Sequence, residues 1–143
     1  MEKFIIYTDG GARGNPGLAG AGAVIENAAG GKLKEAHHAL GVMTNNEAEY
    51  HALLLGLATL KKLVGKKRTR EIEVEARLDS ELVVNQLNGG YQIKEKNLQP
   101  LFIKVWNARV ADFPHLTFRH IPREDNREAD RLANRAMDED VLQ

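Results

Sequence analysis

The spacing of apolar residues predicts one long amphipathic helix near the middle of the chain. From Thr44 to Val64, apolar side chains recur at helical spacing and form a broad apolar face. Thr44 and Glu47 have the spacing of a capping box, which is typical of a helix start, and Gly65 is a typical residue just after a helix end. We therefore expect a helix over residues 44–64.

A period of two predicts strands on both sides of this helix. Residues 71–78 alternate between polar and apolar, as a strand with one solvent-exposed face does. Glycine-rich residues 9–17 are predicted to form a loop. Runs rich in β-forming residues predict the remaining strands at 3–8, 20–27, 32–42 and 116–121, with the second and third joined as an antiparallel pair.

Three further helices are predicted at 80–88, 97–112 and 126–137, and Trp106 in the second of these is expected to be a core residue. The predicted order is β-β-β-α-β-α-α-β-α. Strands joined through helices indicate an α/β fold with a mixed sheet covered by helices.

The composition is that of one globular domain. The chain has 143 residues, 43% of them hydrophobic and 28% charged, so we expect a single domain over 1–143. No apolar run approaches the ~18 residues that span a bilayer, and the N-terminus does not resemble a secretory signal. The absence of cysteine excludes disulfides and thiolate metal sites. These features favour a cytoplasmic protein without a membrane segment.

The charge balance gives no general support for nucleic-acid binding, because 20 basic and 20 acidic side chains cancel. Basic residues crowd the stretch 61–70, and acidic residues mark the tail 138–143, which is expected to be flexible. Both stretches are equally well explained as solvated surface.

Four carboxylates fall at the ends of predicted elements, where α/β sheets form crevices. Such carboxylates repel one another unless cations lie between them. Oxygen ligands without thiolates or paired histidines favour Mg²⁺ or Mn²⁺ over Zn²⁺. The four candidates are Asp9, Glu49, Asp79 and Asp130.

Each acid also has a structural interpretation. Asp9 could form a turn, and Asp79 could cap the helix that follows it. Glu49 and Asp130 could be acids that favour a helix N-terminus. Taken singly, each residue is explained more readily by structure than by catalysis, so the hypothesis depends on their combination.

Four short motifs surround these acids and follow one another along nearly the whole chain. They are Ile-Tyr-Thr-Asp-Gly-Gly-Ala-Arg-Gly-Asn-Pro-Gly at 6–17, Thr-Asn-Asn-Glu-Ala-Glu at 44–49, Asp-Ser at 79–80 and Asn-Arg-Glu-Ala-Asp-Arg-Leu-Ala at 126–133. Together they resemble the motifs of type 1 ribonuclease H, in its short, reverse-transcriptase-like branch. The resemblance implies a ribonuclease H-like fold, with a five-stranded mixed sheet and helices on both faces.

The resemblance also implies an activity, the endonucleolytic hydrolysis of the RNA strand of RNA–DNA hybrids to 5′-phosphate and 3′-hydroxyl ends. The four acids would hold two Mg²⁺ ions in the presence of substrate, with Mn²⁺ as an alternative. Duplex RNA is a second candidate substrate. A monomer without an obligate protein partner is expected.

The same resemblance implies substrate contacts on both strands. The glycine-rich segment would approach the RNA strand closely, and Thr44 with Asn45 would hold a DNA phosphate at a helix N-terminus. The alternative is that Thr44 only caps its helix. The implied substrate-binding residues are Gly11, Ala12, Arg13, Asn15, Thr44, Asn45, Asn46 and Ser80.

Two features depart from the bacterial members of the family. The segment 89–97 has only two lysines, so the basic helical protrusion is expected to be absent, and binding should be weaker or use surfaces such as 61–70. The loop that carries a mobile histidine in the family is short here. His120 precedes this loop, and Arg123 or Glu124 would occupy the neighbourhood of the histidine; Arg123 and His120 are thus candidate auxiliary residues.

Two other functional classes compete with this hypothesis. A non-catalytic binding module would keep the fold and the substrate contacts, but the intact acid set argues against it. A junction resolvase or integrase would share scattered acids, but not the glycine-rich segment together with Thr-Asn-Asn. A nucleotide-binding oxidoreductase is set aside because Gly-x-Gly-x-x-Gly does not follow the first strand.

Overall fold

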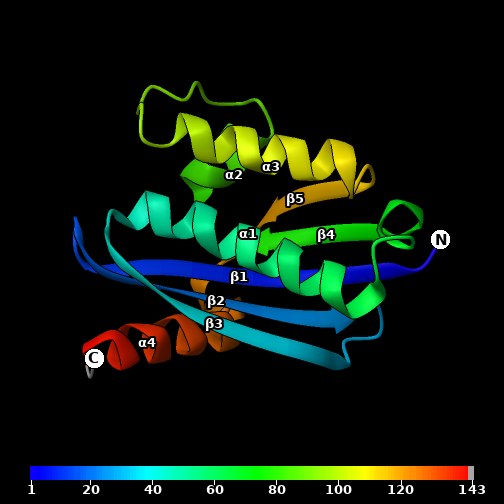
Figure 1. Cartoon of the computed structure of the whole chain (residues 1–143), viewed down its shortest axis with the longest axis horizontal. Helices are drawn as coiled ribbons and strands as arrows, with labels where there is room; N and C mark the ends of the chain where they lie inside the picture. The colour runs from blue at the N-terminus through cyan, green and yellow to red at the C-terminus, as the bar shows by residue number, and fades with distance from the viewer. Residues whose placement is uncertain (142–143) are drawn as a thin grey trace.

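The computed structural model describes residues 1–141, in which strands and helices follow the predicted order (Figure 1). Short 3₁₀ helices occupy Thr69–Glu71 and Arg123–Asp125. The main elements are β1 (Lys3–Gly14), β2 (Gly17–Asn27), β3 (Lys32–Met43), α1 (Asn45–Val64), β4 (Glu73–Leu78), α2 (Glu81–Leu87), α3 (Gln99–Ala111), β5 (Leu116–His120) and α4 (Arg127–Val141).

The strands form one mixed sheet in the order β3-β2-β1-β4-β5. The pairs β1–β2 and β2–β3 are antiparallel, whereas β1–β4 and β4–β5 are parallel. Helices α1, α2 and α3 lie on one face of the sheet and α4 lies on the other (Figure 1). The predicted α/β class, with a five-stranded mixed sheet and helices on both faces, is confirmed.

Helix α1 supplies most of the helical side of the main core. Leu53, Leu57 and Leu60 are buried against a sheet face that includes Ile6 and Val74. Burying one such leucine contributes about 1.5–3 kcal/mol, so this packing holds α1 firmly along the sheet. As a result, the N-terminal turns of α1 are fixed beside the middle of β1.

The loop predicted over residues 9–17 is wrong, because β1 continues to Gly14. Gly10 pairs with Ala21 and Gly14 with Gly17, so the strand pairing with β2 runs up to a tight turn. The glycines carry no local β preference, and the hydrogen bonds from β2 determine the strand. The segment is therefore part of the sheet.

Smaller differences concern the ends of elements and one side chain. The alternating segment starts as a strand only at Glu73, after the 3₁₀ helix. Helix α4 runs to Val141, beyond its predicted end at 137, whereas residues 142–143 lie outside the described residues and the flexibility of the tail stays a prediction. Trp106 is 54% exposed, so its assignment to the core is wrong. Across the described part of the chain, none of the helices combines the length and apolar content needed to cross a membrane.

Candidate active site

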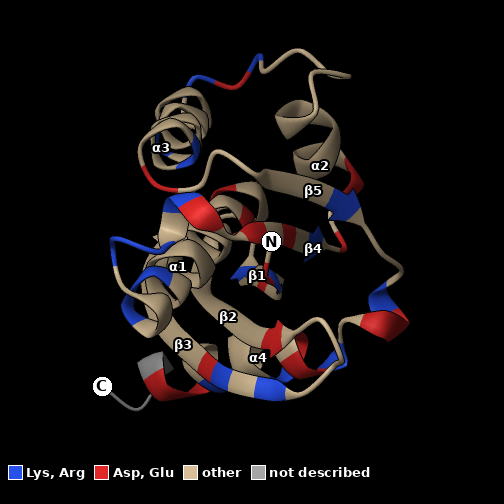
Figure 2. Cartoon of the chain, turned by 90° about the vertical axis from the view of Figure 1, so that its right-hand side faces the viewer, with Lys and Arg blue, Asp and Glu red and all other residues tan. Residues whose placement is uncertain are grey.

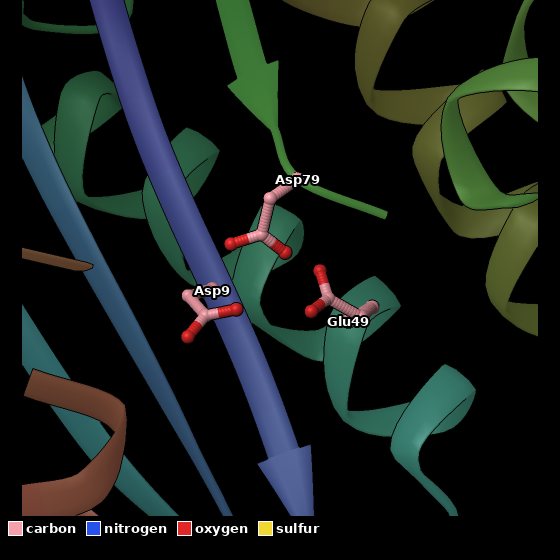
Figure 3. A group of neighbouring side chains, drawn as sticks. All are labelled: Asp9, Glu49 and Asp79. Atoms are coloured by element: carbon pink, nitrogen blue, oxygen red, sulfur yellow. The ribbon is translucent and has the colours of Figure 1, made fainter. Parts of the chain in front are cut away.

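Three of the four predicted acids meet beside the centre of the sheet. The parallel register of β1 and β4 aligns Thr8 with Leu78, so the residues that follow, Asp9 and Asp79, are neighbours. Glu49 reaches them from α1, and the three carboxylates point toward one another (Figure 3). One oxygen from each lies within 4.8 Å of the others. We call Asp9, Glu49 and Asp79 the carboxylate cluster.

A glycine at position 10 allows α1 to come this close. A Cβ atom on Gly10 would lie 2.1 Å from the backbone oxygen of Ala48, a distance that no side chain could tolerate. The Gly10 N–H donates a 3.2 Å hydrogen bond to Oε1 of Glu49. The first glycine of the motif therefore serves the contact between β1 and α1, and the approach of the segment to an RNA strand stays a prediction.

Two members of the carboxylate cluster, Asp9 and Glu49, are buried and Asp79 is half-buried, so the cluster is electrostatically unfavourable without a counterion. Asp9 is 7% exposed and Glu49 is 6% exposed. Burial and the charge of Asp79 raise the pKa of Asp9 to about 8. Burial and the charge of Asp9 raise the pKa of Glu49 well above its ordinary value. Oε2 of Glu49 is buried without a hydrogen-bond partner among the described residues. A divalent cation with a preference for oxygen ligands fits this donor set.

The cluster lies in an open cleft of about 390 Å³. Asp130, from the first turns of α4, lines the cleft but is not one of the three acids whose oxygens lie within 4.8 Å of one another. The residues that line the cleft are Asp9, Gly10, Gly11, Ala12, Arg13, Asn45, Asn46, Glu49, Asp79, Ser80, Arg123, Asp130, Asn134 and Met137.

Two predicted substrate-binding asparagines join β1 to the start of α1. Oδ1 of Asn45 accepts a 2.8 Å hydrogen bond from the N–H of Ala12, and Oδ1 of Asn15 accepts a 3.0 Å bond from the N–H of Asn45. Neither NH₂ group has a hydrogen-bond partner in the described part of the chain. Asn45 lines the cleft, whereas Asn15 lies outside its lining. Both amides thus keep their donors available for acceptor groups of a ligand.

Thr44 also lies outside the cleft lining, and it caps α1. Its Oγ1 accepts from the N–H of Glu47, and the Glu47 carboxylate accepts from the N–H of Thr44. The predicted capping box is therefore present. The implied contact of Thr44 with a phosphate stays a prediction.

The two auxiliary candidates are placed differently. Arg123, in the 3₁₀ helix before α4, lines the cleft, whereas His120 ends β5 on the surface and does not. Arg13 lines the cleft from the end of β1 and forms a 2.6 Å ion pair with Asp138 of α4. Arginine side chains from two separate segments of the chain therefore line the cleft that holds the acids.

Sequence reasoning missed four residues that contact or line the site, of which Gly10 is described above. Asn134 and Met137 reach the cleft from later turns of α4. Asn126 is 1% exposed, and its Nδ2 donates to the backbone oxygen of Thr8 and to Oδ2 of Asp79. A buried polar residue beside a predicted metal ligand indicates a residue of the site. Here that neighbourhood can be recognised only once the order of the strands is known.

The basic stretch 61–70 lies at the far end of α1 from the carboxylate cluster, and Figure 2 looks at that end of the molecule. At ~1.5 Å per residue, the helix separates the two by about 20 Å. Three of its cations make internal contacts: Lys61 pairs with Asp112, Arg68 with Glu2, and Arg70 donates to backbone oxygens of α3. A contact between this stretch and a hybrid stays a prediction. Between α2 and α3 the described chain has no further helix, so the basic protrusion is absent.

A buried carboxylate cluster on a five-stranded mixed sheet, with α1 on one face and α4 on the other, defines the ribonuclease H-like class of protein. Comparisons with known proteins agree with this class. The family described as reverse transcriptase-like matches residues 7–136. The chain belongs to this family, and within it to type 1 ribonuclease H.

Individual relatives support the assignment. A ribonuclease H of Hydrogenovibrio crunogenus is 35% identical over 152 residues, covering 97% of this chain and 98% of the relative. A bifunctional protein of Mycobacterium tuberculosis is 41% identical over 137 residues, and the match covers 95% of this chain but only 36% of that protein.

Solved structures agree in fold over nearly the whole chain. LC11-RNase H1, isolated from compost by a metagenomic approach, is 47% identical with a TM-score of 0.92, covering 99% of both chains. The same protein in complex with an RNA/DNA hybrid gives a TM-score of 0.93, covering 96% of this chain and 99% of that one.

Proposed function

We propose that this protein hydrolyses the RNA strand of RNA–DNA hybrids endonucleolytically, giving 5′-phosphate and 3′-hydroxyl ends. The observation that carries the proposal is the convergence of Asp9, Glu49 and Asp79 within 4.8 Å in an open cleft. The hybrid complex of LC11-RNase H1, which is 47% identical, supports the substrate class.

The proposed cofactor is a pair of Mg²⁺ ions, with Mn²⁺ as an alternative. When bound, such ions activate a water and stabilise the leaving oxygen of an in-line displacement. The ligands would be the carboxylate cluster and Asp130, whose side chains supply the hard oxygen donors that these ions prefer. Gly10 holds Oε1 of Glu49 in place through its N–H, so this ligand is oriented before any ion arrives.

The amide groups near the N-terminus of α1 are proposed to hold the substrate backbone. The N–H groups of Asn45 and Glu47 are already used by Asn15 and Thr44. A phosphate at this helix end would therefore be held by the side-chain NH₂ groups of Asn45 and Asn46 and by the positive end of the helix. The NH₂ group of Asn15, in the turn between β1 and β2, would reach the same nucleic-acid strand of the substrate.

The arginines and Ser80 complete the proposed site. Arg13 and Arg123 line the cleft and would attract the phosphates that flank the scissile bond. The Ser80 hydroxyl caps α2 by accepting from the N–H of Val83, and its own O–H would remain free to donate to a ligand in the cleft. Selection of RNA requires contacts to 2′-hydroxyl groups, for which Gly11 and Ala12 are the proposed residues.

We also propose a cytoplasmic monomer without an obligate protein partner. Size-exclusion chromatography with light scattering tests the oligomeric state. A dimer that persists at nanomolar concentration would contradict the proposal.

The proposed reaction is tested with a panel of end-labelled substrates in Mg²⁺, repeated in Mn²⁺. RNA–DNA hybrid, duplex RNA, single-stranded RNA and duplex DNA are compared, and the product ends are mapped with phosphatase and kinase. We expect cleavage of the RNA strand of the hybrid, with 5′-phosphate ends. Binding of the hybrid without cleavage in both metals would favour a binding module instead.

A further inference from the structure

Asn126 is a buried amide that connects three of the four candidate metal ligands. Its Nδ2 donates a 2.9 Å hydrogen bond to the backbone oxygen of Thr8, which immediately precedes Asp9. The same nitrogen donates a 3.0 Å bond to Oδ2 of Asp79. Its backbone oxygen accepts a 3.1 Å bond from the N–H of Asp130. One residue therefore contacts segments of β1, the end of β4 and α4.

The chemistry of the amide fixes its orientation. An NH₂ group has two hydrogens, and two acceptor oxygens lie in front of it. The reversed amide would bring its oxygen against a carbonyl and a carboxylate, both acceptors. The donors must therefore face Thr8 and Asp79.

Helix capping does not explain this arrangement. An asparagine just before a helix ordinarily accepts a hydrogen bond from an N–H of the first turn. In Asn126, Oδ1 is buried and has no hydrogen-bond partner among the described residues. The side chain is turned toward the acids, although this leaves its own oxygen unpaired, which carries a desolvation cost.

Asp79 needs such a contact when Asp9 and Glu49 are ionised, as metal binding requires, because the three charges then repel one another. Asp9 and Glu49 each offer an oxygen within 4.8 Å, and the charge of Asp79 raises the pKa of both. Repulsion favours rotamers that turn the Asp79 side chain out of the cluster. A donor on Oδ2 opposes that rotation and leaves the other oxygen of the carboxylate available to a ligand.

We propose that Asn126 is a positioning residue that orients the Asp79 carboxylate and ties the first turn of α4, with Asp130, to the middle of β1. This inference rests on the proposed function, because it assigns Asn126 to the preparation of that metal site. It predicts that Asn126 acts on metal affinity and turnover, and only weakly on hybrid binding.

The first test compares Asn126→Ala with Leu132→Ala. Leu132 is 1% exposed in α4, the helix that follows Asn126, so its truncation loosens α4 without removing a contact to the acids. Mg²⁺ is titrated into each substrate-free protein, and the backbone N–H signals of Gly10 and Gly11 are followed by NMR. Loss of a residue that orients metal ligands typically weakens metal binding by roughly 10–100-fold. We expect at least a tenfold rise in Kd for Asn126→Ala and less than a twofold change for Leu132→Ala.

Kinetics on the hybrid give a second readout. Asn126→Ala should lower kcat with little change in KM, because the reacting centre is altered and the substrate grip is intact. Wild-type Mg²⁺ affinity in Asn126→Ala, or an equal loss in Leu132→Ala, would overturn the proposal. If the wild type binds Mg²⁺ as expected but cuts no hybrid, the proposed function fails while the role of Asn126 at the metal site stands.

A third measurement uses the wild type and does not depend on how well a variant folds. The side-chain NH₂ protons of Asn126 should exchange slowly with solvent, and they should shift during the Mg²⁺ titration with the same midpoint as Gly10. Rapid exchange, or signals that Mg²⁺ leaves unchanged, would contradict the assignment.

Discussion

Replacing Asp9 with asparagine should stabilise the metal-free protein while abolishing cleavage. Folding raises the pKa of Asp9 from an ordinary 3.8 to about 8, through burial and the charge of Asp79. A tenfold change in proton affinity corresponds to about 1.4 kcal/mol. At pH 7 Asp9 is ionised in the unfolded chain and must take up a proton on folding, which opposes folding by up to about 4 kcal/mol. Because asparagine also loses hydrogen bonds of the carboxylate, we expect a net gain on the order of 2 kcal/mol, taken as about half of this limit.

Thermal unfolding in EDTA measures the gain. For a domain of this size, 1 kcal/mol corresponds to about 3 °C, so the melting temperature of Asp9→Asn should rise by about 6 °C. Mg²⁺ should raise the melting temperature of the wild type and leave that of the variant unchanged, because the ion stabilises only the protein that binds it.

Asp125→Asn is the matched control, because it removes the same charge from an exposed side chain outside the cleft lining. Its melting temperature should change by no more than about 2 °C, as expected for a surface substitution. Our reasoning is refuted if Asp9→Asn melts at or below the wild type in EDTA, or if Mg²⁺ stabilises both equally.

Three further predictions address pH, packing and the auxiliary residues. In EDTA the stability of the wild type should fall between pH 5.5 and pH 8. Folding raises carboxyl pKa values, which favours the folded state at low pH, and this stabilisation is lost as the pH rises toward about 8. Melting curves followed by circular dichroism measure the stability at each pH, and a rise in stability over this range would contradict the prediction. Gly10→Ala should lower the free energy of unfolding, measured by chemical denaturation, by about 3 kcal/mol, because its Cβ clashes with Ala48. Gly11→Ala should lower it by less than about 1 kcal/mol, because that Cβ would lie 3.7 Å from the nearest side-chain atom. Arg123→Ala should lower kcat about tenfold, because it removes a positioned charge near the reacting phosphate, and His120→Ala should lower kcat less than about twofold. A large loss in the His120 variant would show that the loop before α4 is aligned incorrectly with the histidine-bearing loop of the family.

Local signals in the sequence were enough to predict most of the elements. The capping box of Thr44 and Glu47 defines the start of α1 without any tertiary information, and the structure contains it. The end of β1 could not be predicted in this way. Its glycines are held in the sheet by pairing with β2. The local conformational preference of glycine does not predict that pairing.

Burial was harder to predict than secondary structure. Helix α3 has apolar residues around much of its circumference, so periodicity does not distinguish the buried Val105 from its exposed neighbour Trp106. Packing against α1 decides which of them faces inward.

The four acids were proposed from their positions and from motif resemblance, but their distances depend on topology. Parallel pairing of β1 with β4 brings Asp9 and Asp79 together, and the sequence contains no local signal for that pairing. For the same reason Asn126 was not singled out, since its partners Thr8 and Asp79 become neighbours only in the assembled sheet.

The most direct test of the proposed nuclease activity is cleavage of an RNA–DNA hybrid labelled on the RNA strand, with the wild type and Asp9→Asn side by side, in Mg²⁺ and in EDTA. The carboxylate cluster predicts cutting of the RNA strand by the wild type in Mg²⁺ alone, and none by the variant. Cutting in EDTA, or equal cutting by Asp9→Asn, would contradict a metal-dependent nuclease built on this cluster.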